Sequence, residues 1–267
     1  MNNLTINEIK NRDLDPCIFA IYFIPVSIYS NKGNDYIKEQ LAYSVIACNI
    51  HGTRKYITTI FTDDFSKTSA WYDLFSTWKQ KGLQTMLYAV IPNDDKLKKA
   101  LSLAFPEVEC FLSCFTTIRK LISYFSCGYS SKFLEQIKNI FIAENIKEFE
   151  MKTEEFLEEN SEYPFIKDLI SDDLKNAKEH INVSSTLRKH IFSFYFMREY
   201  IKKLNSLSHV KPNFSSLLEF EELIVPTIQT FEFRMYATKK EWNEIISIIY
   251  LNKKDLLIKY LWYIIMA

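Results

Sequence analysis

The sequence predicts an α/β protein: a mixed β-sheet with flanking helices and a large helical insertion. Three observations support this fold class. The first 62 residues hold β-rich apolar runs separated by turn signals, residues 66–113 alternate between helical and strand patterns, and residues 115–222 show helical spacing almost throughout. The length of 267 residues and apolar content of 48% suit a folded chain with a sizeable core and exclude a disordered one.

Three strands are predicted at the start, over residues 17–29, 41–50 and 55–62. The segments CIFAIYFIPVSIY, LAYSVIACNI and KYITTIFT are rich in β-branched and aromatic residues, as strands require. Residues 31–34, with Gly33, supply one turn, and His51-Gly52 supplies the next. A turn signal between two β-rich runs predicts a hairpin, so we expect an antiparallel meander.

The periodicity then changes to that of a helix. Four apolar residues of SKTSAWYDLFSTWKQKG fall at i, i+3, i+4 and i+7: Trp71, Leu74, Phe75 and Trp78. Ser66 or Thr68 is expected to cap the start of this helix, and Gly82 to end it in the left-handed region. A strand over 83–91, a helix over 95–105 and a strand over 108–113 follow. The order βββαβαβ with flanking helices is that of the ribonuclease H-like fold.

The remaining chain is predicted to be mostly helical. Residues 223–236 (LIVPTIQTFEFRMY) are expected to form an edge strand or an extended connection, and the chain ends in a helix. We expect three parts: residues 1–114 as the first part of the core, 115–184 as the helical insertion, and 185–267 as C-terminal helices that complete the core. An acidic stretch in the insertion is interpreted as a solvated helix face: Glu144, Glu148, Glu154, Glu155, Glu158 and Glu159.

Charge and cysteine content restrict the class of protein. The formal net charge is zero, with 33 basic and 33 acidic side chains, which disfavours a dedicated duplex-binding protein but leaves room for a local basic face. The five cysteines include no CxxC pair and are expected to be buried free thiols. The N-terminus has no signal-peptide core and the longest apolar run is too short to span a bilayer, so a cytoplasmic location without membrane contact is expected.

A collinear series of segments over residues 15–255 resembles the catalytic domain of Mutator-type bacterial insertion-sequence transposases. The series contains an N-x-x-G turn (Asn49 to Gly52), a helix with a tryptophan, the pair Lys81-Gly82, and the turn Phe105-Pro106 followed by Arg119. The later segments STLRKHIFSFYFMREYIKKLNSL and KKEWNEII resemble the C-terminal region of that family. Full-length members carry a helical DNA-binding region ahead of this domain, and we expect that region to be absent here.

The resemblance implies DNA transposition by two-metal strand cleavage and joining. Three carboxylates would hold two magnesium or manganese ions roughly 4 Å apart. The family carboxylate positions fall at Ile21, Pro92 and Arg198, and its Cys-x-x-His positions fall at Ser113 and Thr116. Magnesium needs oxygen ligands, which none of the three side chains at the carboxylate positions supplies. We therefore predict no catalytic carboxylates, no metal site and no cofactor.

A shift in register brings other acidic residues near only two of the three carboxylate positions. Asp94 or Asp95 lies close to the second position, and Glu199 is adjacent to the third, although one residue rotates a side chain by about 100° around a helix. The first position has no acidic candidate from Pro16 to Asn34. Asp15 is six residues away, roughly 20 Å along a strand.

Basic residues provide candidate contacts to nucleic acid: Arg119, Arg188, Lys189, Arg198, Lys202 and Lys203, with Lys96, Lys98 and Lys99 near the sheet end. Solvated helix faces are the alternative interpretation of the same residues.

Three functions remain open. The chain is a non-catalytic pseudoenzyme that binds DNA or an intact transposase, an active recombinase with carboxylates shifted to Asp94, Asp95 and Glu199, or a folded remnant of a mobile element without present function. Zero net charge favours contact with a protein in the first case, and a homodimer is a further possible assembly.

Overall fold

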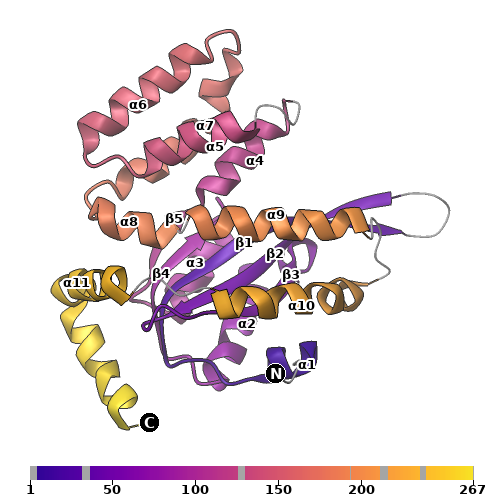
Figure 1. Cartoon of the computed structure of the whole chain (residues 1–267), viewed down its shortest axis with the longest axis vertical. Helices are drawn as coiled ribbons and strands as arrows, with labels where there is room; N and C mark the ends of the chain where they lie inside the picture. Colours follow the sequence, from indigo (N-terminus) through magenta and orange to yellow (C-terminus); the bar gives the residue numbers. More distant parts are fainter. Residues whose placement is uncertain are drawn as a thin grey trace. The chain divides into compact units, whose positions relative to one another are not determined.

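The structure, a computed structural model, describes residues 5–31, 37–125, 130–192, 194–210, 216–234 and 239–266. The described residues form a mixed α/β protein with a five-stranded mixed sheet in the order β3-β2-β1-β4-β5 (Figure 1). The strands are β1 (Cys17–Asn31), β2 (Ile37–Asn49), β3 (Arg54–Phe61), β4 (Thr85–Ile91) and β5 (Glu109–Leu112). The predicted α/β class with a mixed sheet is confirmed.

The first three strands form the expected antiparallel meander. β1 pairs with β2 from Ile18↔Asn49 to Asn31↔Ile37, and β2 pairs with β3 from Ala42↔Phe61 to Cys48↔Arg54. Asn31, predicted to begin a turn, is the last residue of β1, and residues 32–34 of that turn lie outside the described residues. The continuous apolar run of β1 agrees with its central place in the sheet, because a strand between two others is covered on both faces.

The conformation of the turn between β2 and β3 explains why asparagine and glycine occur in it. The side-chain Oδ1 of Asn49 accepts hydrogen bonds from the backbone N–H groups of His51 (3.0 Å) and Thr53 (2.9 Å). Gly52 has φ +81°, a conformation that L-residues with a side chain rarely adopt. A Cβ there would also lie 2.9 Å from Cδ2 of Trp242, whose indole N–H donates to the carbonyl of Ile50. The turn therefore needs glycine both for its φ angle and for the approach of Trp242.

The chain divides into two compact units. The first holds residues 1–89, 94–109 and 195–267, and the second holds residues 90–93 and 110–194. The helices of the first unit are α1 (Ile6–Asn11), α2 (Thr68–Gln80), α3 (Asp95–Ala104), α9 (Phe194–Val210, from Tyr195 onward), α10 (Leu217–Arg234) and α11 (Lys239–Met266), with a short 3-10 helix, η1 (Thr62–Phe65). Those of the second are α4 (Cys114–Ile122), α5 (Ser130–Phe141), α6 (Ile146–Glu159), α7 (Phe165–Glu179) and α8 (Ser185–Phe192).

Opposite faces of the meander pack against different helices of the first unit. Phe23 lies with its ring centroid 5.9 Å from that of Trp71 on α2, so this face contacts α2. Tyr22, the preceding residue, lies 6.3 Å from Phe196 on α9, and the hydroxyl of Ser44 is 2.8 Å from that of Tyr200 on α9. Since successive side chains of a strand alternate between faces, these contacts assign each β1 residue from Ala20 onward to one helix layer.

The predicted cap of α2 is wrong. The N-cap residue is Lys67, and no side chain accepts a capping hydrogen bond there. Ser66 has helical backbone angles (φ −66°, ψ −14°) because it ends η1, whereas a capping side chain needs an extended backbone. Thr68 is already inside the helix. Gly82 does follow α2 with φ +102°, as expected for the residue after a helix C-terminus.

The extended segment predicted over 223–236 is also wrong. Residues up to Arg234 belong to helix α10, which contains Pro226, and residues 235–236 lie outside the described residues. Proline and β-branched residues disfavour a helix on local grounds. Here Phe220, Ile224 and Ile228 are buried at helical spacing, while Pro226 is exposed. Tertiary packing of this face outweighs the local preference.

No helix among the described residues is long and apolar enough to cross a membrane. The acidic stretch from Glu144 to Glu159, most of which lies on α6, is exposed apart from Glu148, which is half-buried, so its interpretation as a solvated face is confirmed.

Candidate functional site

Ile21, where the resemblance places the first carboxylate, lies in the central strand β1 with its side chain fully buried. Ile21 and Phe23 are two residues apart, so both side chains lie on the sheet face that contacts α2. Arg198, where the resemblance places the third carboxylate, is on α9, which contacts the opposite face through Phe196. A carboxylate at position 21 would therefore point away from α9.

Arg198 also points away from the sheet. Its side chain is 46% exposed, whereas Met197 and Tyr200 on the same helix are buried. Its Nε is 3.3 Å from Oε1 of Glu199, an exposed pair that contributes little to stability. Within the first unit, the structure does not bring the first and third positions together, and Glu199 is paired with Arg198 instead.

The second position, Pro92, is buried and directly follows β4 in the second unit. Beside it, the amide of Asn93 donates to Oδ1 of Asp173 at 3.4 Å. Proline offers no side-chain oxygen, so this position supplies no ligand for a hard cation.

The two aspartates near this position belong to the start of α3. Asp94 is the N-cap residue, and its Oδ1 accepts from the N–H groups of Lys96 (2.9 Å) and Leu97 (3.1 Å). Asp95 is exposed in the first turn, where a negative charge interacts favourably with the helix dipole. The geometry of both residues matches a role in initiating α3.

Among the described residues, no group of three or more His, Cys, Asp or Glu side chains is placed to hold a metal ion. The side chains at the three positions where the resemblance places carboxylates do not fit divalent ions such as magnesium, because isoleucine, proline and arginine provide no oxygen ligand. The resemblance places a Cys-x-x-His pair at Ser113 and Thr116. Ser113 is the N-cap residue of α4 and Thr116 lies in its first turn, so hydroxyl groups stand where a thiol and an imidazole would be expected.

The basic candidates occupy different environments. On α9, Arg198, Lys202 and Lys203 are exposed on the side opposite the buried Met197 and Leu204. In the second unit, Lys189 is exposed on α8, and Arg119 is half-buried on α4. The structure thus brings three of the predicted basic residues together on one helix.

Arg188 differs from the expectation that it contacts nucleic acid. It is 1% exposed, and its guanidinium donates to the carbonyls of Phe141 (2.6 Å) and Val183 (2.8 Å), with further bonds to those of Ala143 and Ile181. Burial lowers its pKa from the usual arginine value, and the charge of Glu148 opposes that shift. With its donors committed to carbonyls in the interior, Arg188 cannot reach a phosphate.

Two buried carboxylates were missed by the sequence reasoning. Asp173 on α7 is fully buried and accepts from Thr117 Oγ1 (2.9 Å) and Lys120 Nζ (2.6 Å) on α4. Its sequence signal is helical spacing: Ile166, Ile170 and Asp173 share the buried face of α7. An acid on an apolar helical stripe indicates a paired interior charge.

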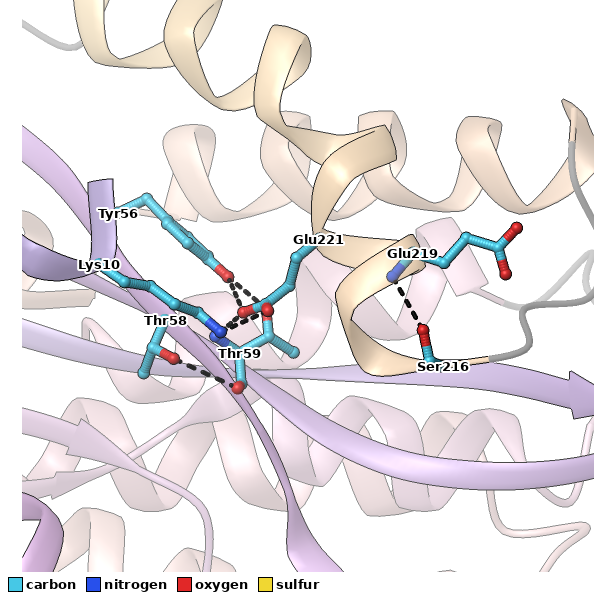
Figure 2. A network of polar contacts seen from close by, with 7 residues as sticks. All are labelled: Lys10, Tyr56, Thr58, Thr59, Ser216, Glu219 and Glu221. Atoms are coloured by element: carbon cyan, nitrogen blue, oxygen red, sulfur yellow. Dashed lines mark hydrogen bonds and ion pairs between the residues drawn. The ribbon is translucent and has the colours of Figure 1, made fainter. Parts of the chain in front are cut away.

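The second missed carboxylate is Glu221 on α10, which is 1% exposed (Figure 2). Its Oε1 accepts from the Tyr56 hydroxyl (3.0 Å) and the Thr59 backbone N–H (3.2 Å), and its Oε2 pairs with the ammonium of Lys10 on α1. The Tyr56 hydroxyl is also 2.7 Å from Thr59 Oγ1. Burial, together with the negative charge of Glu221, raises the pKa of Tyr56 well above its usual value. This network attaches α1 and α10 to β3.

Comparison with known proteins matches the family model "Transposase, Mutator family" over residues 3–219. No curated protein matches the chain at a significant level. The matched range covers more than half of the sequence, and it includes the sheet and the helices up to the start of α10. The chain therefore belongs to the Mutator family of transposases.

Proposed function

We propose that this chain is a transposase-like domain that no longer cuts DNA and acts by binding it. The observation that carries the proposal is the identity of the residues at the three family positions. Ile21, Pro92 and Arg198 offer no oxygen ligand, and two-metal cleavage depends on carboxylates that hold both ions. The nearby acids have other roles, since Asp94 caps α3 and Glu199 pairs with Arg198.

The proposed DNA contact is the exposed face of α9. Arg198, Lys202 and Lys203 lie there, while Phe196, Met197 and Leu204 hold the opposite side of the helix in the interior. Lysine and arginine bind DNA by neutralising phosphates, which releases counterions and makes affinity fall with salt. Because the net charge of the chain is zero, we expect weak binding without strong long-range attraction.

The proposal extends to the fold and the cell compartment. We interpret the sheet order β3-β2-β1-β4-β5, with α2 and α3 between strands, as a ribonuclease H-like core. Residues 1–114 and 185–267 would form that core around an insertion of residues 115–184. The buried thiols of Cys17, Cys48 and Cys114 support a reducing, cytoplasmic location.

The loss of cleavage is tested by incubating the protein with supercoiled plasmid and Mn²⁺ and measuring nicked product. We expect the wild-type protein and a D94N/E199Q variant to give the same background. Asparagine keeps the capping role of position 94 while removing the carboxylate, so the variant remains folded. Metal-dependent nicking that disappears in D94N/E199Q, or only when D95N is added to that variant, would overturn the proposal and support an active recombinase with shifted carboxylates.

A further inference from the structure

Helix α3 turns three lysines toward solvent. Its inner side is apolar and holds four buried residues: Leu97, Ala100, Leu101 and Ala104. On the outer side Lys96 and Lys99 are exposed at i and i+3, and Lys98 is exposed beside them. Among the described residues, no carboxylate forms an ion pair with any of these lysines. The outer side of α3, defined by Lys96, Lys98 and Lys99, is therefore a basic surface whose charges are available to an anionic partner.

The acids at the start of α3 leave this surface positive. Oδ1 of Asp94 is engaged by the backbone N–H groups of Lys96 and Leu97, so this carboxylate serves the helix end. Residues 95–104 carry three lysines and one aspartate, Asp95, which leaves the helix with a net charge of +2.

The basic surfaces of α3 and α9 lie on opposite sides of the sheet of the first unit. α3 packs against α2, where the rings of Phe105 and Phe75 are 6.1 Å apart, and α2 contacts the sheet face that holds Phe23. α9 contacts the other face next to Tyr22, and Figure 1 shows it in front of the strands. Because each helix directs its exposed cations away from the sheet, the two basic surfaces point in opposite directions.

One short stretch of duplex cannot reach both surfaces. The sheet lies between them, and DNA is stiff, with a persistence length of about 150 base pairs. Each surface offers only three cations, which is little to offset sharp bending of a duplex around the unit. Contacts on both sides would therefore involve two separate DNA segments.

The residue types on α3 suit phosphate groups. A lysine ammonium binds phosphate as a point charge. Residues 95–104 (DKLKKALSLA) contain no arginine, asparagine or glutamine, which form bidentate contacts to base edges. We therefore expect contacts to the DNA backbone that do not depend on base sequence.

We propose that the outer side of α3 is a second DNA-contact surface, so that a single chain holds two duplexes, one against α9 and one against α3. The inference rests on the proposed DNA contact of α9 and adds a second surface to it. The two contacts are independent, because the duplex on one side of the sheet does not touch the helix on the other.

The inference is tested by asking whether the protein joins two duplexes. A biotinylated duplex is fixed to streptavidin beads, and a fluorescent duplex of unrelated sequence is added with the wild-type protein at low salt. We expect the beads to retain the fluorescent duplex only when the protein is present. Retention should pass through a maximum as the protein concentration rises, since excess protein occupies each duplex separately, and it should fall steeply with salt.

The variant K96E/K99E tests whether the second duplex is bound by α3. Retention should fall at least ~10-fold because two phosphate contacts become repulsive, while fluorescence anisotropy should still detect one duplex bound through α9. The helix should remain folded, since glutamate near a helix N-terminus interacts favourably with the dipole. K202E/K203E on α9 should also abolish retention, whereas K167E/K175E, the same charge change on exposed lysines of α7, should leave it unchanged.

The failure of this inference can be told apart from the failure of the proposed function. Binding in anisotropy without retention on the beads would show one DNA surface per chain and overturn the inference alone. Retention that survives in K96E/K99E would overturn it too, because both duplexes would then lie on the α9 surfaces of associated chains. Equal loss in K167E/K175E would reduce the effect to general charge. Absence of DNA binding in both assays would contradict the DNA contact of α9 as well.

Discussion

At the scale of single residues, the interior of this protein holds charged side chains that are satisfied by short-range partners. Asp173 meets a hydroxyl, an ammonium and an amide, and Arg188 meets four carbonyls. Burying such groups is tolerated only when hydrogen bonds replace the lost water. These residues therefore specify how the helices of the second unit pack, which makes them sensitive points for substitution.

Asp173→Ala should destabilise the protein by about 2 kcal/mol or more, because the buried Thr117 hydroxyl loses its acceptor and Lys120 loses its partner. The contribution of Lys120 is reduced by its exposure to solvent. Urea unfolding followed by circular dichroism measures the change. The neighbouring, exposed Asp172→Ala serves as the control and should alter stability by less than about 0.5 kcal/mol. Equal effects of the two substitutions would contradict the assigned role of Asp173.

The buried thiol of Cys48 predicts how stability changes with alkaline pH. Burial raises its pKa from 9.0 to about 11, an effect that nearby Arg54 partly opposes. The unfolded thiol ionises near pH 9 while the folded thiol stays protonated, so its contribution to stability is complete below pH 9 and is lost as pH rises to about 11. The loss should reach at most about 1.4 kcal/mol per pH unit.

Comparing urea unfolding of wild type and Cys48→Ala between pH 8 and pH 11 isolates this contribution, since all other titrating groups are present in both proteins. The difference in unfolding free energy should shrink steadily above pH 9. A constant difference across the range would show that Cys48 does not titrate as proposed.

At the scale of elements, α10 shows how tertiary packing decides a segment whose local sequence favours extension. Glu221, Ile224 and Ile228 are all buried, so one face of α10 carries apolar contacts together with a fully paired carboxylate. Pro226 lies away from that face, where it disturbs the packing least. The Glu221 network links α10 to β3 and α1.

Glu221→Ala should cost roughly 3 kcal/mol, because it leaves the buried Thr59 N–H and the Lys10 ammonium without their carboxylate. Glu221→Gln should cost less, since its amide oxygen can still accept from Tyr56 and Thr59. Thermal unfolding of both variants, with the exposed Glu222→Ala as control, measures the order of effects. If Glu222→Ala proved as damaging as Glu221→Ala, the network would not be what holds α10.

Much of the fold could be predicted from the sequence where hydrophobic periodicity is strong. The apolar run of residues 17–29 predicts a strand, and the helical spacing of Trp71, Phe75 and Trp78 predicts a helix. Both are present as β1 and α2, and these three side chains of α2 are buried. The cap of α2 and the helix α10 were missed because each depends on a neighbouring element, η1 for the first and β3 for the second. Likewise, the burial of Arg188 depends on carbonyls up to 47 residues away.

At the scale of the whole molecule, the chain belongs to a transposase family, and the proposed loss of cleavage rests on three of its residues. The chain matches the Mutator transposase family over residues 3–219, yet it has Ile21, Pro92 and Arg198 at the positions where the resemblance places carboxylates. The sequence could identify the residues at these positions but not their directions. Only the pairing of β1 shows that Ile21 lies on the face contacting α2, opposite to α9.

The central claim, DNA binding without cleavage through α9, is tested most directly by fluorescence anisotropy of a labelled duplex titrated with protein at several salt concentrations. Binding should weaken steeply with salt, and K202E/K203E should reduce the slope of log affinity against log salt by about 0.9 for each lost phosphate contact. The matched control K167E/K175E makes the same charge change on the exposed side of α7 and should bind as wild type does. Absence of binding at low salt, or equal loss in both variants, would contradict the account and direct attention to a protein partner.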